Sequence, residues 1–131
     1  MKRLLIVDDD ELDRKLIVSA LKRADPSIRI HEAQSGQETH IKLKELWPIL
    51  TLLDIRMPGM DGFEVLEGIR SDEHYAELQV LMLSGSDDPE DMRRARELGA
   101  NDYCVKPHTR EGYQALADDI CTRWLSETTK H

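Results

Sequence analysis

The fold of this chain is decided by the stretch Leu50-Thr-Leu-Leu-Asp54-Ile-Arg56-Met-Pro58-Gly59-Met60-Asp61-Gly62. A short apolar run ends at the carboxylate of Asp54, and Pro58-Gly59 then interrupts the strand. Asp61-Gly62 is typical of the start of a helix. In open α/β sheets, ligands bind at the carboxyl ends of the strands. The stretch therefore predicts an acidic group, Asp54, at a ligand-binding edge.

Five short apolar runs predict strands, and a segment with helical spacing of apolar residues follows each of them. The predicted strands cover residues 4–7, 28–33, 49–53, 79–83 and 102–105. The second run alternates apolar and polar residues, so we expect it at an edge of the sheet. Leu12 in the first helix and Ile41 in the second are among the residues expected to face the core. The alternation predicts a doubly wound α/β fold, with five parallel strands and five helices on both faces of the sheet.

Right-handed crossovers bring the carboxyl ends of all parallel strands to one edge of the sheet. We expect five polar side chains to meet there although they lie far apart in the sequence: Asp8, Asp9, Asp54, Ser84 and Lys106. Carboxylates this close repel one another, and a divalent cation such as Mg²⁺ would relieve the repulsion. The ammonium group and the hydroxyl suit a phosphoryl group, which Asp54 could accept as a nucleophile.

Each of these signals has a simpler explanation when it is taken alone. Asp8-Asp9-Asp10 is typical of a helix cap with solvated charges, and Ser84 is an ordinary turn residue. Lys106-Pro107 alone would only mark the end of a strand. Together, however, these residues stand at the ends of the first, third, fourth and fifth predicted strands, and this combination favours a functional site.

Length and composition predict a single domain over residues 1–131. The net charge is 18 − 26 = −8, which disfavours binding to nucleic acid. The sequence contains no apolar run of membrane-spanning length and no signal peptide, so we expect a cytoplasmic protein with no membrane partner. Cys104 and Cys121 show neither disulfide nor zinc spacing, and we expect both to be reduced.

Four segments resemble the receiver domain of two-component response regulators. They are Leu4-Leu-Ile-Val-Asp8-Asp9, Leu52-Leu-Asp54-Ile-Arg-Met-Pro58-Gly-Met-Asp-Gly62, Val80-Leu-Met-Leu-Ser84-Gly and Gly99-Ala-Asn-Asp-Tyr103-Cys-Val-Lys106-Pro107. The resemblance implies a flavodoxin/CheY-like sheet with the strand order 2-1-3-4-5. It also implies that one aspartate takes a phosphoryl group from a histidine kinase or a histidine phosphotransfer protein.

The resemblance assigns the acidic residues. Asp54 matches the phosphoacceptor, and Asp8 and Asp9 match the acidic pair that binds Mg²⁺, with Asp9 as the direct ligand and Asp8 acting through water. Arg56 stands where the family offers a backbone carbonyl to the metal. Arg56 and Ser86 also flank the expected phosphoryl site, where we expect them to influence the approach of water.

The resemblance also implies how a signal leaves the site. Ser84 matches the switch hydroxyl, Lys106 the lysine that contacts the phosphoryl group, and Tyr103 the aromatic switch. In the family, these groups remodel the face formed by the fourth helix, the fifth strand and the last helix. A phosphoryl group adds about two negative charges and three acceptor oxygens. This change is enough to shift the equilibrium between two packing arrangements of that face.

We expect the last helix to run to about Ser126 and no output domain to follow it, so that output passes through a partner protein. Such a regulator would be a chemotaxis-type messenger or a phosphorelay shuttle. His40 stands where the family often has leucine, and we interpret it as a packing residue. The oligomeric state is left open, because we find no obvious basic residue of the last helix opposite Asp102 for the dimer that the DNA-binding relatives form.

Two functions from other classes compete with this interpretation. A Mg²⁺-dependent aspartyl phosphatase of the haloacid dehalogenase type would be a true enzyme with a similar set of groups. It would need a second aspartate two residues after the nucleophile, where this chain has Arg56. A phosphate-independent adaptor would not need the complete acidic set. We therefore predict a non-enzymatic receiver.

Overall fold

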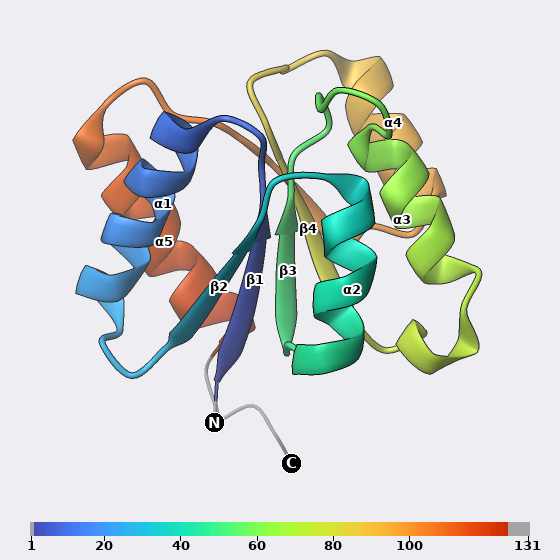
Figure 1. Cartoon of the computed structure of the whole chain (residues 1–131). Coiled ribbons are helices and arrows are strands. Elements are labelled where there is room, and N and C mark those ends of the chain that lie inside the picture. The colour runs from blue at the N-terminus through green and yellow to red at the C-terminus, as the bar shows by residue number, and fades with distance from the viewer. Residues whose placement is uncertain (1, 126–131) are drawn as a thin grey trace.

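The computed structural model describes residues 2–125 and contains one five-stranded parallel sheet with the order β2-β1-β3-β4-β5. The predicted doubly wound fold and strand order are confirmed. All five predicted strands are present: β1 (Arg3–Val7), β2 (Arg29–Ala33), β3 (Leu50–Leu53), β4 (Gln79–Ser84) and β5 (Asp102–Val105). Since adjacent strands are parallel, their carboxyl ends lie at the same edge, the upper edge in Figure 1.

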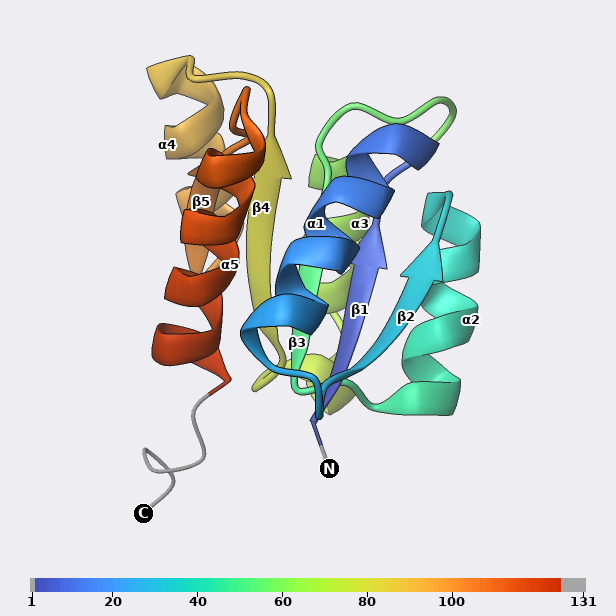
Figure 2. The ribbon, with the colours of Figure 1, turned by 90° about the vertical axis from the view of Figure 1, so that its left-hand side faces the viewer.

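Five α-helices cover the sheet: α1 (Glu11–Ala24), α2 (Gly36–Leu46), α3 (Gly62–Arg70), α4 (Pro89–Glu97) and α5 (Arg110–Trp124). Figures 1 and 2 show α1 and α5 on one face and the other three helices on the opposite face. A short 3₁₀ helix, η1 (Glu73–Tyr75), precedes β4 and was not predicted. The predicted end of the last helix at Ser126 lies outside the described residues.

The central strands are buried on both faces. Every residue of β3 is buried, as are the last four residues of β1 and the last five of β4. Strand β2 lies at the edge, as its alternating pattern predicted, and its interior residues are partly exposed. Two apolar cores therefore lie on the two faces of the sheet, one under α1 and α5 and one under α2, α3 and α4.

Two apolar residues that were expected in the core are exposed instead. Leu12 is 66% exposed and Ile41 is 58% exposed. At about 100° per residue, Leu12 lies about 140° around α1 from the buried Ile17. Ile41 lies about 200° from Leu43, which fills the core position of α2 together with Thr39. Apolar residues two or five positions apart therefore cannot share one buried stripe.

Local sequence signals set several helix ends. The Asp10 side chain caps α1, and Asp61 and Glu64 form a complete capping box at the start of α3. Gly99 follows α4 with φ = 101°, a conformation that favours glycine. His40 is half-buried against Gly68 of α3, as expected for a packing residue. Within residues 2–125, no helix combines the length and the apolar character needed to cross a bilayer.

Candidate functional site

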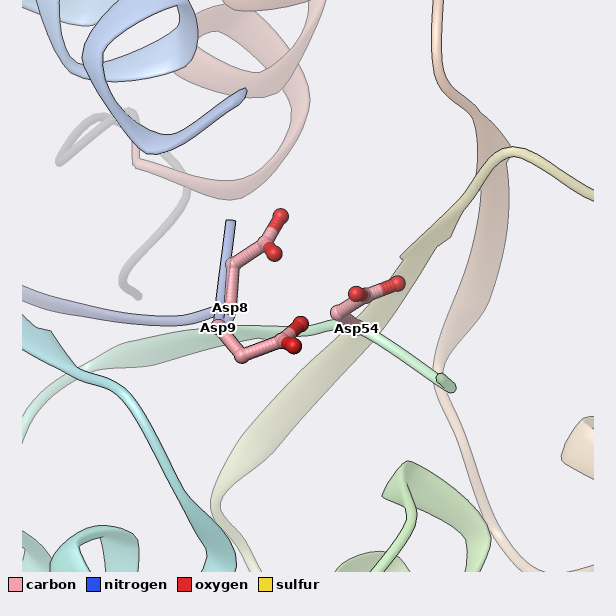
Figure 3. Close-up of side chains that lie close together, drawn as sticks. All are labelled: Asp8, Asp9 and Asp54. Carbon is pink, nitrogen blue, oxygen red and sulfur yellow. The ribbon is translucent and has the colours of Figure 1, made fainter. Parts of the chain in front are cut away.

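Three carboxylates gather at the carboxyl edge of the sheet. Asp8 and Asp9 follow β1, and Asp54 follows the adjacent strand β3. The backbone N–H of Asp54 donates to the Val7 carbonyl at 2.9 Å, which continues the strand pairing into the site. One carboxylate oxygen from each aspartate lies within 4.8 Å of the others. Figure 3 shows the three side chains close together. The predicted meeting of these three residues is therefore observed in the structure.

The environment of these carboxylates disfavours a full set of negative charges. Asp8 and Asp54 are buried, whereas Asp9 is exposed. The pKa of Asp54 is raised to about 7, chiefly because the carboxyl is buried and next because the charge of Asp8 lies close to it, while the charge of Lys106 opposes the shift. A cation would relieve this repulsion, and closely spaced carboxylate oxygens are the ligands that Mg²⁺ prefers. The donor set therefore fits a divalent cation held by Asp8, Asp9 and Asp54.

Lys106 follows β5 and reaches into the acidic cluster. Its ammonium nitrogen lies 2.8 Å from Asp8 Oδ2, 2.8 Å from Asp13 Oδ2 and 3.6 Å from Asp54 Oδ2. Burial alone would lower the pKa of Lys106, but the hydrogen bonds to Asp13 and Asp8 and the charge of Asp54 together raise it. The ammonium group is therefore charged and close to the predicted phosphoacceptor.

Ser84 ends β4 and is 1% exposed. Its hydroxyl oxygen accepts a hydrogen bond of 3.1 Å from the backbone N–H of Ser86. The Ser86 carbonyl in turn accepts a hydrogen bond of 2.8 Å from the Tyr103 hydroxyl. Ser84 and Tyr103, which were predicted as switch residues, are therefore linked through one residue of the loop that follows β4.

The side chain of Arg56 reaches toward Asp91 of α4. It is 75% exposed, and its guanidinium lies 3.7 Å from Asp91 Oδ2. The same carboxylate oxygen accepts a 2.7 Å hydrogen bond from the Ser86 hydroxyl. The role of the Arg56 backbone carbonyl as a metal ligand stays a prediction, because no described contact tests it.

An open cleft of about 470 Å³ lies over the site. Five residues that the sequence singled out line it, namely Asp54, Arg56, Ser84, Ser86 and Lys106, together with Asp13 and Gly85. Asp13 was not predicted, because an acid in the first turn of a helix is explained by the helix dipole alone. The cleft can therefore admit a phosphoryl group between the carboxylate of Asp54 and the ammonium of Lys106.

Arg14 of α1 is a second residue near the site that the sequence did not predict. It is 7% exposed, and its Nη1 donates a 2.7 Å hydrogen bond to the Asp8 carbonyl. Its Nε donates to Glu32 of β2 at 2.9 Å. Arginine is almost never fully buried, so no sequence signal distinguishes it from the exposed basic residues of the helix. Arg14 holds the end of β1 in place beneath the acidic pair.

Gly62 keeps the loop after β3 close to Asp54. Its N–H donates a 2.7 Å hydrogen bond to the Ile55 carbonyl. A Cβ added at this position would lie 2.2 Å from the Asp54 carbonyl oxygen, closer than any side chain allows. The Asp61-Gly62 pair therefore starts α3 directly against the backbone of the candidate phosphoacceptor.

One expectation about the last helix was wrong. Arg123 of α5 lies opposite Asp102, with its Nη2 3.1 Å from Asp102 Oδ2. It also pairs with Asp119, one helical turn earlier, at 3.1 Å. The approach of α5 to β5 was not visible in the sequence, because the two residues are 21 positions apart.

Comparisons with known proteins agree with this geometry. The family model for the response regulator receiver domain matches residues 4–117. The chain is 35% identical over 118 residues to the gliding motility regulatory protein of Myxococcus xanthus. That alignment covers 90% of this chain but 15% of the relative, so the chain spans a small part of that protein's length.

Two solved structures share the whole architecture. The Mn²⁺-bound form of response regulator Rcp1 has a TM-score of 0.87 and 26% identity, and the match covers 98% of each chain. The phosphorylated cyanobacterial phytochrome response regulator RcpA has a TM-score of 0.88 and 29% identity, covering 95% of this chain and 94% of that one. The chain therefore belongs to the receiver domain family of two-component response regulators.

Proposed function

We propose that this receiver domain accepts a phosphoryl group on Asp54 from the phosphohistidine of a histidine kinase or a histidine phosphotransfer protein. One observation carries the proposal: the Asp54 carboxylate lies beside those of Asp8 and Asp9, with the Lys106 ammonium 3.6 Å away. Receiver domains of this family bind Mg²⁺ at such an acidic pocket and are generally signalling modules rather than enzymes.

In the proposed reaction, a carboxylate oxygen of Asp54 attacks the phosphorus of the phosphohistidine. A P–O bond forms as the P–N bond breaks, and the electron pair of the broken bond returns to the imidazole nitrogen, which takes up a proton. The product on Asp54 is an acyl phosphate. The buried position of Asp54 limits the approach of water, so transfer from a bound donor is favoured over hydrolysis.

The other residues of the cleft would position and neutralise the transferred group. Lys106 would pair with one phosphoryl oxygen, and the Ser84 hydroxyl would donate to another. Mg²⁺ held by Asp8, Asp9 and Asp54, with the Arg56 carbonyl as a further ligand, would neutralise negative charge on the phosphoryl oxygens.

We further propose that the signal leaves through the face formed by α4, β5 and α5 and is received by a partner protein. The hydrogen bonds from Ser86 to Ser84 and from Tyr103 to Ser86 support this route. If the Ser84 hydroxyl turned toward a phosphoryl group, its bond to the Ser86 N–H would be lost. The carbonyl that holds the Tyr103 hydroxyl would then be free to move, and the exposed face near β5 would change.

The proposal is tested by incubating the protein with acetyl phosphate and Mg²⁺ and measuring its intact mass. We expect one added phosphoryl group on the wild-type protein and none on Asp54→Asn. Rapid multiple turnover of the phosphoryl donor would instead indicate an aspartyl phosphatase, for which no comparison gives support. Failure to label the wild-type protein would indicate a phosphate-independent adaptor.

A further inference from the structure

Asp13 of α1 shares the lysine of the candidate phosphorylation site. Asp13 Oδ2 lies 2.8 Å from the Lys106 ammonium nitrogen, although the two residues are 93 positions apart. The ammonium nitrogen lies closer to Asp13 than to Asp54, from which it is separated by 3.6 Å. Asp13 and Lys106 both line the cleft over Asp54, with side chains that are 30% and 13% exposed.

Asp13 lies in the first turn of α1, where any acidic residue interacts favourably with the helix dipole, but its carboxylate does not cap the helix. The Asp10 side chain caps α1, and it accepts its hydrogen bond from the backbone N–H of Asp13, which any residue but proline supplies. Within residues 2–125, the Asp13 carboxylate accepts a hydrogen bond from the Lys106 ammonium group. The contact therefore joins α1 to the end of β5 through the lysine of the site.

We infer that Asp13 is a positioning residue that holds Lys106 away from Asp54 until a phosphoryl group is present. This inference rests on the proposed phosphorylation of Asp54. A phosphoryl group on Asp54 needs the ammonium group, so Lys106 must give up its bond to Asp13 or share it. Asp13 thereby stabilises the unphosphorylated state and lowers the affinity of the site for phosphoryl groups.

Asp8 cannot replace Asp13 in this role, although it also contacts Lys106 at 2.8 Å. The carboxylate of Asp8 accepts the backbone N–H of Asp10 at 2.9 Å and belongs to the acidic cluster that fits a cation. Once a cation neutralises that cluster, Asp13 remains as the anion that competes for Lys106. The competition is therefore expected to be strongest in the state that is ready for phosphorylation.

The test uses beryllofluoride, which forms a stable phosphoryl-like adduct on an aspartate, in saturating Mg²⁺. Its affinity for the full chain is measured by ¹⁹F NMR titration. We expect Asp13→Asn to bind beryllofluoride about fivefold more tightly than the wild-type protein, because a competing partner of Lys106 has been removed. Asp13→Glu retains the charge and should bind more weakly than Asp13→Asn.

Glu11→Gln is the matched control. Glu11 also lies in the first turn of α1, carries the same charge, and contacts the exposed Lys15 at 3.6 Å instead of Lys106. We expect this variant to keep the wild-type affinity for beryllofluoride. An equal gain in Glu11→Gln would show that net charge alone acts, and it would overturn the inference.

A double-mutant cycle with Lys106→Met shows whether Asp13 acts through the lysine. In that background, we expect Asp13→Asn to change the affinity for beryllofluoride by less than a factor of about two. A persistent fivefold gain, or unchanged or weaker binding in the single variant Asp13→Asn, would refute the positioning role. Failure of the wild-type protein itself to bind beryllofluoride would contradict the proposed function, and the inference would fall with it.

Discussion

The carboxyl group of Asp54 is buried beside Asp8, and both conditions favour its protonated form. Its pKa in the folded protein without a cation is raised to about 7, compared with 3.8 for an unperturbed aspartate. The folded state therefore binds this proton more tightly than the unfolded state does. The resulting stabilisation is complete below the unfolded pKa and is lost as the pH rises through about 7.

Asp54→Asn removes this ionisation while keeping the size of the side chain. We expect it to increase the free energy of unfolding measured by urea denaturation in EDTA, with a larger gain at about pH 8 than at about pH 5. Asp118→Asn, at an exposed position of α5, is the control and should show little change across this range. A gain for Asp54→Asn that is equal at both pH values would contradict the raised pKa.

Arg56 and Ser86 line the cleft, and both contact Asp91, at 3.7 and 2.7 Å. The guanidinium is therefore placed where it can influence how water reaches a phosphoryl group on Asp54. We expect Arg56→Asn to change the rate of dephosphorylation, measured by intact mass over time, with little change in the affinity for Mg²⁺.

Arg93→Asn is the control for this prediction, because Arg93 is an exposed arginine of α4 that pairs with Glu90 and Glu97 on the same helix. It should keep the wild-type decay rate. If Arg56→Asn also keeps the wild-type rate of dephosphorylation, the proposed role of Arg56 in water access is contradicted.

At the scale of elements, β3 contains a polar atom that its surroundings do not satisfy. The hydroxyl of Thr51 is buried in the sheet and has no hydrogen-bond partner among residues 2–125. We expect Thr51→Val to stabilise the protein by about 1 kcal/mol, because the hydroxyl is removed with no bond lost. Thr39 of α2 is equally buried, but its hydroxyl donates to the Ser35 carbonyl at 2.8 Å.

Thr39→Val should therefore destabilise the protein by about 1 kcal/mol, opposite in sign to Thr51→Val. Urea denaturation of the two variants checks both values. If both substitutions change the free energy of unfolding equally, the Thr51 hydroxyl has a hydrogen-bond partner in solution.

The junction between β3 and α3 depends on the absence of a side chain at Gly62. A Cβ there would meet the Asp54 carbonyl oxygen at 2.2 Å, whereas a Cβ on Gly85 would meet nothing within 4 Å. We expect Gly62→Ala to destabilise the protein by about 2 kcal/mol or more and to reduce labelling of Asp54, since the loop must move.

Gly85→Ala is the matched control for stability and should change the free energy of unfolding by less than about 0.5 kcal/mol. Thermal and urea denaturation measure both variants. A stable Gly62→Ala with normal labelling would show that the β3–α3 loop can shift without disturbing the site.

At the scale of the whole molecule, the acidic cluster joins the ends of β1 and β3, so a cation bound there is expected to stabilise the complete fold. We expect the melting temperature to rise with the Mg²⁺ concentration and to return to its starting value in EDTA. The physical reason is that a cation held by the three carboxylates would bind their folded arrangement and not the unfolded chain.

Asp9→Asn should weaken this Mg²⁺-dependent shift while having little effect on the melting temperature in EDTA, because Asp9 is exposed. Glu90→Gln is the control, because Glu90 is an exposed residue of α4 that pairs with Arg93 of the same helix, and it should preserve the full shift. A melting temperature of the wild-type protein that does not respond to Mg²⁺ would contradict the metal site.

The sequence by itself determined the elements and the residues that meet at the carboxyl edge of the sheet. Apolar runs ending in Asp8, Asp54 and Ser84 predicted parallel strands, and the geometry of right-handed crossovers then required their ends to lie together. The order of the strands followed from the resemblance to receiver domains. These inferences succeeded because strand patterns and crossover handedness are local or general properties.

The tertiary structure alone decided which side of each helix is buried and which charges pair across the fold. Leu12 and Ile41 are exposed because a helical pattern does not specify how the helix is rotated against its sheet. The contacts of Lys106 with Asp13 and of Arg123 with Asp102 join distant positions. Such ion pairs depend on the packing of whole elements, which brings side chains within a few ångströms only after the chain has folded.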